Sequence, residues 1–152
     1  MKNKLLYIFL FFILTNLINS KIYGAEVYNF DVTEAEILEN GNIFIGKKGG
    51  TATSGDGTVI KAKNFRYDKI KNILIAIGDV EIDDKKENII IYSQKMTYFK
   101  NDELILTEGK SKAIHEGVII DGDNFKYNKF TNILNASGRV KIDNKDQNYF
   151  CL

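Results

Sequence analysis

The sequence predicts an all-β chain, a meander of about eight bent antiparallel strands. Three observations indicate this fold class. One segment occurs twice, apolar and polar residues alternate with period two inside it, and short polar turns lie between the alternating segments. "NFRYDKIKNILIAIGDVEID" (64–83) and "NFKYNKFTNILNASGRVKID" (124–143) align without a gap, and 12 of 20 positions are identical. After residue 25, no window of a dozen residues has helical periodicity.

The repeat unit is about 30 residues long and occurs four times. In segments 67–78, 98–109 and 127–138, a glycine follows a tyrosine by eleven positions. A fainter copy lies at 37–49, where the glycine is displaced to Gly49, which predicts a one-residue bulge. Such a period indicates a stacked array in which each unit covers the apolar face of its neighbour.

Within a unit, one parity is apolar or small and the other is mostly polar, as in an antiparallel strand with one buried face. The first parity holds Leu74, Ala76, Gly78, Val80 and Ile82, with the same residue types at 134, 136, 138, 140 and 142. We expect Asp79, Glu81, Arg139 and Lys141, on the second parity, to face solvent.

The inward parity slips by one residue between Ala62 and Phe65, and the slip recurs in the next two units. It predicts a bulge that bends the strand and keeps both halves facing inward. The repeated glycine predicts a bend in the returning strand or a point of close packing. Turns are expected at "ENGN" (39–42), which is a strong hairpin signal, and at the later segments "DKIKN", "FKNDE", "NKFTN", "DDKKEN" and "DNKDQN".

Residues 1–25 have the features of a signal peptide. Lys2 and Lys4 precede an apolar run at 5–14, which is shorter than a membrane-spanning helix, and Ser20 or Ala25 is small enough to precede the cleavage site. A retained membrane anchor is the alternative. Because the leader holds three of the 21 basic residues and none of the 20 acidic ones, the remainder has a net charge of about −2. This charge does not favour a nucleic-acid partner.

No catalytic or metal-binding constellation stands out. His115 is the only histidine, expected in a polar turn, and Cys151 is the only cysteine, so a zinc site, a nucleophile–base pair and an intramolecular disulfide are not expected. The glycine-rich segment 46–58 lacks the order of a phosphate-binding loop and is expected to be a loop with a bulge. "DGDN" at 121–124 lacks the spacing of a calcium loop. We expect no enzyme, no cofactor and no metal.

The inward stripe is the candidate site, and two interpretations of it remain open: an ordinary filled core, or an apolar trough that accommodates acyl chains between its small residues. The stripe consists of Ile60, Phe65, Tyr67, Leu74, Ala76, Val80, Ile82, Ile91, Met96, Tyr98, Ile105, Ile120, Phe125, Tyr127, Leu134, Ala136, Val140 and Ile142.

Four strips of the chain resemble the OstA/Lpt family of lipopolysaccharide-transport domains. They are "FDVTEAEILENGNIFI", "IKAKNFRYDKIKNILIAIGDVEI", "IIIYSQKMTYFKNDELILTEG" and "NFKYNKFTNILNASGRVKI". The match covers about 26–143, and the "FDVTEAEIL" start and the tyrosine-rich units look most like the N-terminal periplasmic domain of the translocon protein LptD, more than the bridge protein LptA. The sequence stops early in a further unit, so the domain 26–152 looks incomplete.

The resemblance implies a V-shaped β-jellyroll ("β-taco") whose trough carries the lipid A acyl chains of lipopolysaccharide. It implies a periplasmic location associated with the outer membrane and partner jellyrolls joined end to end. The alternatives are a self-associating structural β-repeat without ligand, or an anchored bridge component of the LptC type. Because "NYFCL" (148–152) carries no charge and begins a strand without its return partner, we also expect a homo-oligomer through the C-terminal edge.

Overall fold

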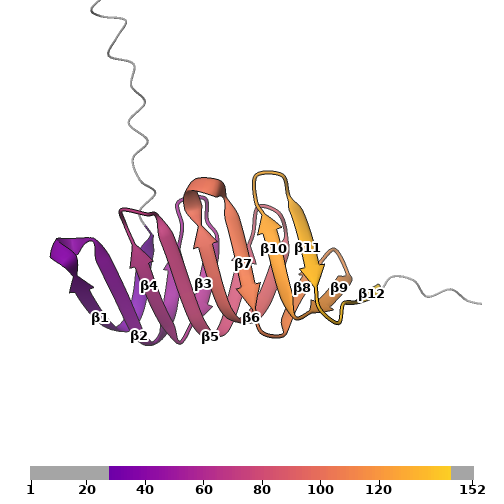
Figure 1. The fold of residues 1–152 in the computed structure, drawn as a ribbon, viewed down its shortest axis with the longest axis horizontal. Coiled ribbons are helices and arrows are strands. Elements are labelled where there is room, and N and C mark those ends of the chain that lie inside the picture. The colour runs from indigo at the N-terminus through magenta and orange to yellow at the C-terminus, as the bar shows by residue number, and fades with distance from the viewer. Residues whose placement is uncertain (1–27, 145–152) are drawn as a thin grey trace, which may run out of the picture.

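The structure is a computed structural model that describes residues 28–144, and it consists of one twelve-stranded antiparallel sheet with two 3-10 turns (Figure 1). The elements are β1 (Asn29–Leu38), η1 (Glu39–Gly41), β2 (Ile43–Thr53), β3 (Val59–Ala62), β4 (Asn64–Asp68), β5 (Ile73–Asp84), β6 (Ile89–Phe99), η2 (Lys100–Asp102), β7 (Leu104–Glu108), β8 (Ser111–His115), β9 (Val118–Gly122), β10 (Asn124–Asn128), β11 (Ile133–Ser137) and β12 (Lys141–Asn144). Within 28–144, no helix is long and apolar enough to cross a membrane.

The twelve strands are eight bent strands, which confirms the prediction. β3 continues into β4, β7 into β8, β9 into β10 and β11 into β12 after interruptions of one to three residues, whereas β1, β2, β5 and β6 run through the bend. Consecutive bent strands form four hairpins, one for each repeat unit. The fold class predicted from the alternation is therefore correct.

The sheet is folded into two arms along a line that we call the crease. The first arm contains β4, β7, β10 and β11, and the second arm contains β3, β8, β9 and β12. β2, β5 and β6 belong to both arms, since each pairs with one neighbour before the crease and another after it. In Figure 1 the crease lies along the lower edge, and the η2 turn and the β10–β11 turn stand at the top.

The crease is made by two consecutive residues with positive φ in every unit. The pairs are Lys48–Gly49, Gly78–Asp79, Gly109–Lys110 and Gly138–Arg139. In β5 the pair stands opposite the single residue Gln94 of β6, so it is a bulge that turns the strand. The first pair lies one repeat length before Gly78–Asp79, with the glycine in its second position. The predicted bulge at Gly49 is therefore present, at the same place as in the other units.

Backbone hydrogen bonds repeat along the crease. The N–H groups of Lys63, Gln94 and Asp123 donate to the carbonyls of Gly78, Gly109 and Gly138, at 3.0, 3.2 and 2.8 Å. Lys63 and Asp123 are the residues between β3 and β4 and between β9 and β10, where the inward parity slips. The predicted slip and the predicted glycine bend thus lie next to each other, on neighbouring strands at the same crease.

Ion pairs between neighbouring strands lie along the crease, with their polarity exchanged between units. The Lys63 Nζ lies 2.7 Å from Asp79, and the Arg139 guanidinium lies 2.6 Å from Asp123. The basic side chain of each pair is exposed to solvent, so each ion pair stabilises the fold weakly. The pattern accounts for the change of sign between the two copies of the strip, because each copy changes both members of the pair.

The first-arm turns of the last three units use the tyrosine of the repeat. The hydroxyls of Tyr67 and Tyr127 donate to the side chains of Asn72 and Asn132 at 2.8 and 3.0 Å, and Tyr98 donates to Glu103 at 2.5 Å. The acceptor residue in each turn has positive φ, and the tyrosine ring is buried. The repeated Tyr–Asn spacing therefore has a structural role in closing the turns.

The glycine-rich segment 46–58 is mostly strand, contrary to the expectation of a loop, because residues 46–53 complete β2 and only 54–58 form a turn. β1 approaches β2 closely there: a Cβ on Gly50 would lie 2.2 Å from the carbonyl oxygen of Asp31. Small residues are required for this approach. His115 is also not in the turn but closes β8, paired with Ile89 and Val118.

The crease gives a first testable prediction. Gly78→Ala should lower the free energy of unfolding by about 1–3 kcal/mol, because Gly78 has φ +85° and an added Cβ would lie 3.0 Å from the Lys63 side chain. Denaturant unfolding measures this. The control Asp79→Asn keeps a residue that tolerates positive φ and removes only an exposed ion pair, so it should change the stability by less than about 0.5 kcal/mol. Equal losses in both variants would contradict the requirement for glycine.

Candidate functional site: the interior between the arms and its mouth

The apolar faces of the two arms meet in one continuous interior. Thirteen of the candidate residues are buried there: Ile60, Phe65, Tyr67, Leu74, Ala76, Val80, Ile82, Ile91, Met96, Tyr98, Ile105, Phe125 and Tyr127. Those on β4, β7 and β10 come from the first arm, and those on β3 come from the second. The parity rule therefore identifies inward side chains on both sides of the crease, while their contact with lipid remains a prediction.

The burial decreases toward the last unit. Ile120, Leu134 and Ala136 are partly buried and pack against the core. Val140 and Ile142 are 44% and 68% exposed, so they are not buried with the other candidates. Ile142 stands directly opposite Ile120 and shares its face of the sheet, so its predicted direction is not contradicted. The counterparts of the two exposed residues, Val80 and Ile82, lie on β5, which has β3 on one side and β6 on the other. β12 pairs only with β9 among the described strands, so its apolar residues lie uncovered.

An aromatic cluster at the first unit completes the interior and was missed from the sequence. Tyr28 packs edge-on against Tyr67 with ring centroids 5.0 Å apart, and Phe30 stacks on Phe44 at 4.0 Å. The Tyr28 hydroxyl is buried without a hydrogen-bond partner, and burial raises the pKa of this tyrosine well above its usual value. The cluster was missed because the first unit diverges from the repeat. The alternation of Tyr28, Phe30 and Val32 with polar residues could have indicated it.

Small polar residues interrupt the interior near the crease. The hydroxyls of Thr107 and Ser111 lie 2.6 Å apart, and the Phe125 N–H donates to the Thr107 Oγ1 at 2.9 Å. The Ser93 hydroxyl donates to the Lys95 carbonyl at 3.0 Å. These hydroxyls satisfy one another or the backbone, so Ser93, Thr107 and Ser111 belong to the bends of the strands.

The rim opposite the crease, which we call the mouth, carries charges that join the two arms. We name the four residues Asp56, Asp84, Lys100 and Lys129 the mouth clasp. The two lysines lie on the first-arm turns, whereas Asp56 lies in the β2–β3 turn and Asp84 ends β5, both in the second arm. Their side chains come together over sequence separations of up to 73 residues.

Lys129 holds the centre of the mouth clasp. Its Nζ lies 2.8 Å from the Asp56 Oδ2 and 3.1 Å from the Asp84 Oδ2, and it donates a hydrogen bond to the Thr58 hydroxyl. The Lys129 and Asp84 side chains are 8% and 2% exposed. The contact with Asp84 is an ion pair and not a hydrogen bond, since the Asp84 Oδ2 accepts none. A buried pair of this kind is costly to break, because either partner alone would be an uncompensated charge.

Lys100 provides the second crossing. Its Nζ lies 3.4 Å from the Asp56 Oδ2, 2.6 Å from the Glu103 Oε1 and 3.0 Å from the Tyr98 hydroxyl. Beside the clasp, Asn132 of the first arm donates to Glu87 of the second at 2.8 Å. The mouth is therefore closed by a connected polar network, with a hollow of about 390 Å³ beside it.

The protonation of Asp56 reflects this setting. Partial burial by itself raises its pKa, but hydrogen bonds from Lys129, from the Ser54 hydroxyl and from the Thr58 N–H outweigh burial and hold the pKa well below its usual range. Burial, followed by the nearby carboxylates of Asp84 and Glu87, raises the pKa of Tyr127. Asp56 is thus a carboxylate, and Tyr127 a neutral phenol, at physiological pH.

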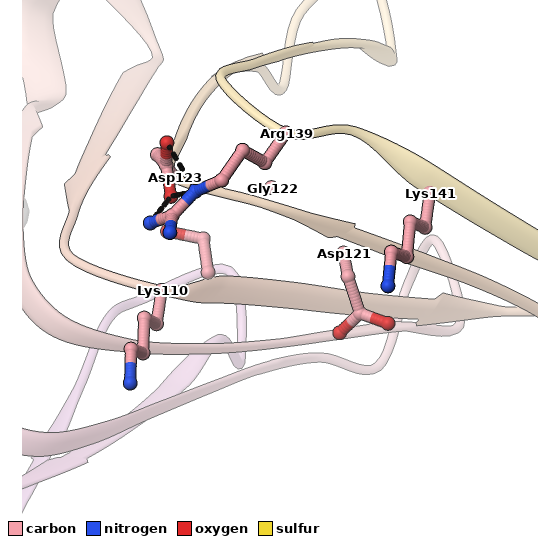
Figure 2. A pocket seen from close by; sticks show the side chains of 7 residues that line it. Lys110, Asp121, Gly122, Asp123, Arg139 and Lys141 are labelled. Atoms are coloured by element: carbon pink, nitrogen blue, oxygen red, sulfur yellow. Dashed lines mark hydrogen bonds and ion pairs between the residues drawn. The ribbon is translucent and has the colours of Figure 1, made fainter.

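A second hollow, of about 340 Å³, lies at the crease of the last unit (Figure 2). Lys110, Arg139 and Lys141 line it with Asp121 and Asp123. In Figure 2 the Arg139 guanidinium is turned onto Asp123, and the hydrogen bonds from its Nε and Nη2 occupy that carboxylate. Because its basic side chains are exposed, this hollow is a solvated surface feature, separate from the interior. Within residues 28–144, no cluster of side chains could hold a metal ion.

The clasp gives a pH-dependent prediction. Because the folded-state pKa of Asp56 is lowered, its contribution to stability is present above the ordinary value of about 3.9 and is lost as the pH falls further. Asp56→Asn should lower the free energy of unfolding by about 1–3 kcal/mol at pH 7. The difference from the wild type should be unchanged at pH 5 and smaller below about pH 4. Denaturant unfolding at each pH checks this, and a difference that grows on acidification would contradict it.

Scans of the sequence against protein-family models and against curated proteins find no match. A search of solved structures finds the crystal structure of LptH, the LptA homologous periplasmic component of the conserved lipopolysaccharide transport device from Pseudomonas aeruginosa. The two structures superpose with a TM-score of 0.71 and 17% sequence identity, over 78% of this chain and 94% of that one. The likeness shows the fold, and the chain is a β-jellyroll of the LptA-like kind.

Proposed function

We propose that this chain binds lipopolysaccharide and passes it along the interior between the two arms, as a module of a periplasmic bridge to the outer membrane. The acyl chains of lipid A lie against the inward stripe, and the headgroup remains at the mouth. The observation that carries the proposal is one continuous apolar interior running from the first unit to the last, partly uncovered at the last. The LptA-like fold supports it.

The partly uncovered end is where lipid enters or leaves. Leu134 and Ala136 of β11 and Ile120 of β9 are accessible there, whereas the corresponding Leu74 and Ala76 are fully buried. The exposed Val140 and Ile142 extend the apolar surface beyond the arms. An acyl chain covering these side chains would gain about 25 cal/mol for each Å² of apolar surface removed from water.

The same end supports the proposed partners. β11 pairs only with β10, and β12 only with β9, among the described strands, so both lie at the edge of the described sheet. A further jellyroll or a second copy of this chain would extend the sheet and continue the interior. The predicted contact through "NYFCL" and Cys151 lies outside the described residues, as does the predicted signal peptide at 1–25. We also propose that the chain is more similar to the N-terminal domain of LptD than to LptA.

A structural β-repeat with a filled core is the second candidate. Nearly complete burial of residues such as Leu74, Met96 and Tyr98 by the protein's own side chains favours it. The two candidates differ in whether the arms part. A carrier exchanges interior contacts for lipid contacts, whereas a filled core keeps them.

Photo-crosslinking from single positions decides between them. A photoreactive residue at Leu134 should crosslink to lipopolysaccharide, whereas one at the adjacent, outward-facing Asn135 should not. In the same assay, Leu134→Asp should reduce binding by about tenfold or more, because a carboxylate would have to lie against acyl chains. Asn135→Asp is the matched control and should bind as the wild type does. Equal crosslinking from both positions would favour the structural candidate.

A further inference from the structure

The mouth clasp stands across the route that a bound lipid would take. Lys100 and Lys129 reach from the first arm to the second with side chains only 6% and 8% exposed. In the other lysine ion pairs of residues 28–144, the lysine side chain is at least 38% exposed. A lipid with its chains inside and its headgroup in water must separate the rims at these contacts.

Parting the rims without a substitute is unfavourable. Lys129 would lose both of its second-arm carboxylates, Asp56 and Asp84, while remaining beside the apolar interior, and an unpaired charge in such a place is costly. Lys100 would lose Asp56 and keep Glu103 of its own arm. An anionic headgroup would supply the missing counter-charge. Phosphate fits this role, since it offers several acceptor oxygens and charge-assisted hydrogen bonds to ammonium groups.

The two carboxylates of the clasp differ in their freedom to leave. Asp84 is 2% exposed at the end of β5. Asp56 lies between the exposed Gly55 and Gly57 at the tip of the β2–β3 turn, and it keeps the Ser54 hydroxyl and the Thr58 N–H as partners within that turn. It can therefore leave the lysines and return to water without being left unpaired.

We propose that Lys100 and Lys129 form the headgroup site of this chain and exchange the Asp56 carboxylate for a phosphate group of an acylated, phosphorylated lipid. The inference rests on the proposed function of lipid carriage and adds a requirement for headgroup charge. The hollow beside the clasp, lined by Lys86, Glu87, Glu103 and Phe130 as well, receives the headgroup. Glu103 stays with Lys100 and Tyr98 in the first arm, and Glu87 accepts a hydrogen bond from Asn132. Asp56 is the second-arm carboxylate that both lysines contact, so it is the competitor of the phosphate.

Binding of two probes to the full chain tests the proposal: a hexa-acylated lipid A that carries its phosphates, and the same lipid after enzymatic dephosphorylation. Asp56→Asn removes the competitor and should strengthen binding of the phosphorylated probe by about threefold or more, whereas Lys129→Gln should weaken it by about tenfold. Neither variant should change binding of the dephosphorylated probe by more than about twofold. Lys126→Gln, on the exposed face of β10, is the control and should have no effect.

Opposite effects of the two variants separate a headgroup site from a purely structural clasp, because loss of structure would change the binding of both variants in the same direction.

A short bis-maleimide tether between Glu87→Cys and Asn132→Cys, in a Cys151→Ser background, should slow loading of the phosphorylated probe at least tenfold. Effects of the same sign, equal responses of the two probes, or unchanged loading of the tethered protein would overturn the proposal. If neither probe binds the wild type, the proposed function fails with it; if both bind equally, only the headgroup site fails.

Discussion

The fold depends on one constraint: an antiparallel sheet with a single apolar face has to bury that face, and this sheet buries it against itself. Strands long enough to serve both arms must turn sharply at mid-length without losing their pairing. The consecutive positive-φ residues of the crease, such as Gly78 and Asp79, make that turn as a bulge, and the backbone hydrogen bonds from Lys63 and its counterparts close it. Both the interior and the mouth follow from the position of this crease.

Two kinds of contact then close the arms, and they differ in reversibility. Along the interior, apolar side chains and the aromatic cluster around Tyr28 and Tyr67 attract without direction. In the function that we propose, lipid chains replace them contact for contact. At the mouth, Lys129 and Asp56 are specific charged partners that only another charged group can replace. In the proposed function, a carrier built in this way keeps its interior packed against water before lipid binds, and it has a defined place where it opens.

The sequence predicted the features that repeat and missed those that cross between arms. Period-two alternation placed Phe65 and Leu74 correctly on either side of a turn, and the recurring glycine located the crease. The same parity did not predict the exposure of Val140 and Ile142, because burial there depends on a covering strand and not on the strand's own pattern. Asp56 and Lys129 looked like ordinary solvated turn residues. No local pattern joins positions 73 residues apart, and only the folded sheet brings them together.

The central claim is that the interior takes up acyl chains, and the most direct test is native mass spectrometry of the full chain isolated from its producing cell without detergent, followed by fatty-acyl analysis of what is released. The account predicts a complex heavier than the polypeptide by one phosphorylated, multiply acylated lipid, which organic solvent releases. A chain that has the mass of the polypeptide alone, and that takes up no lipopolysaccharide when it is supplied, would contradict it.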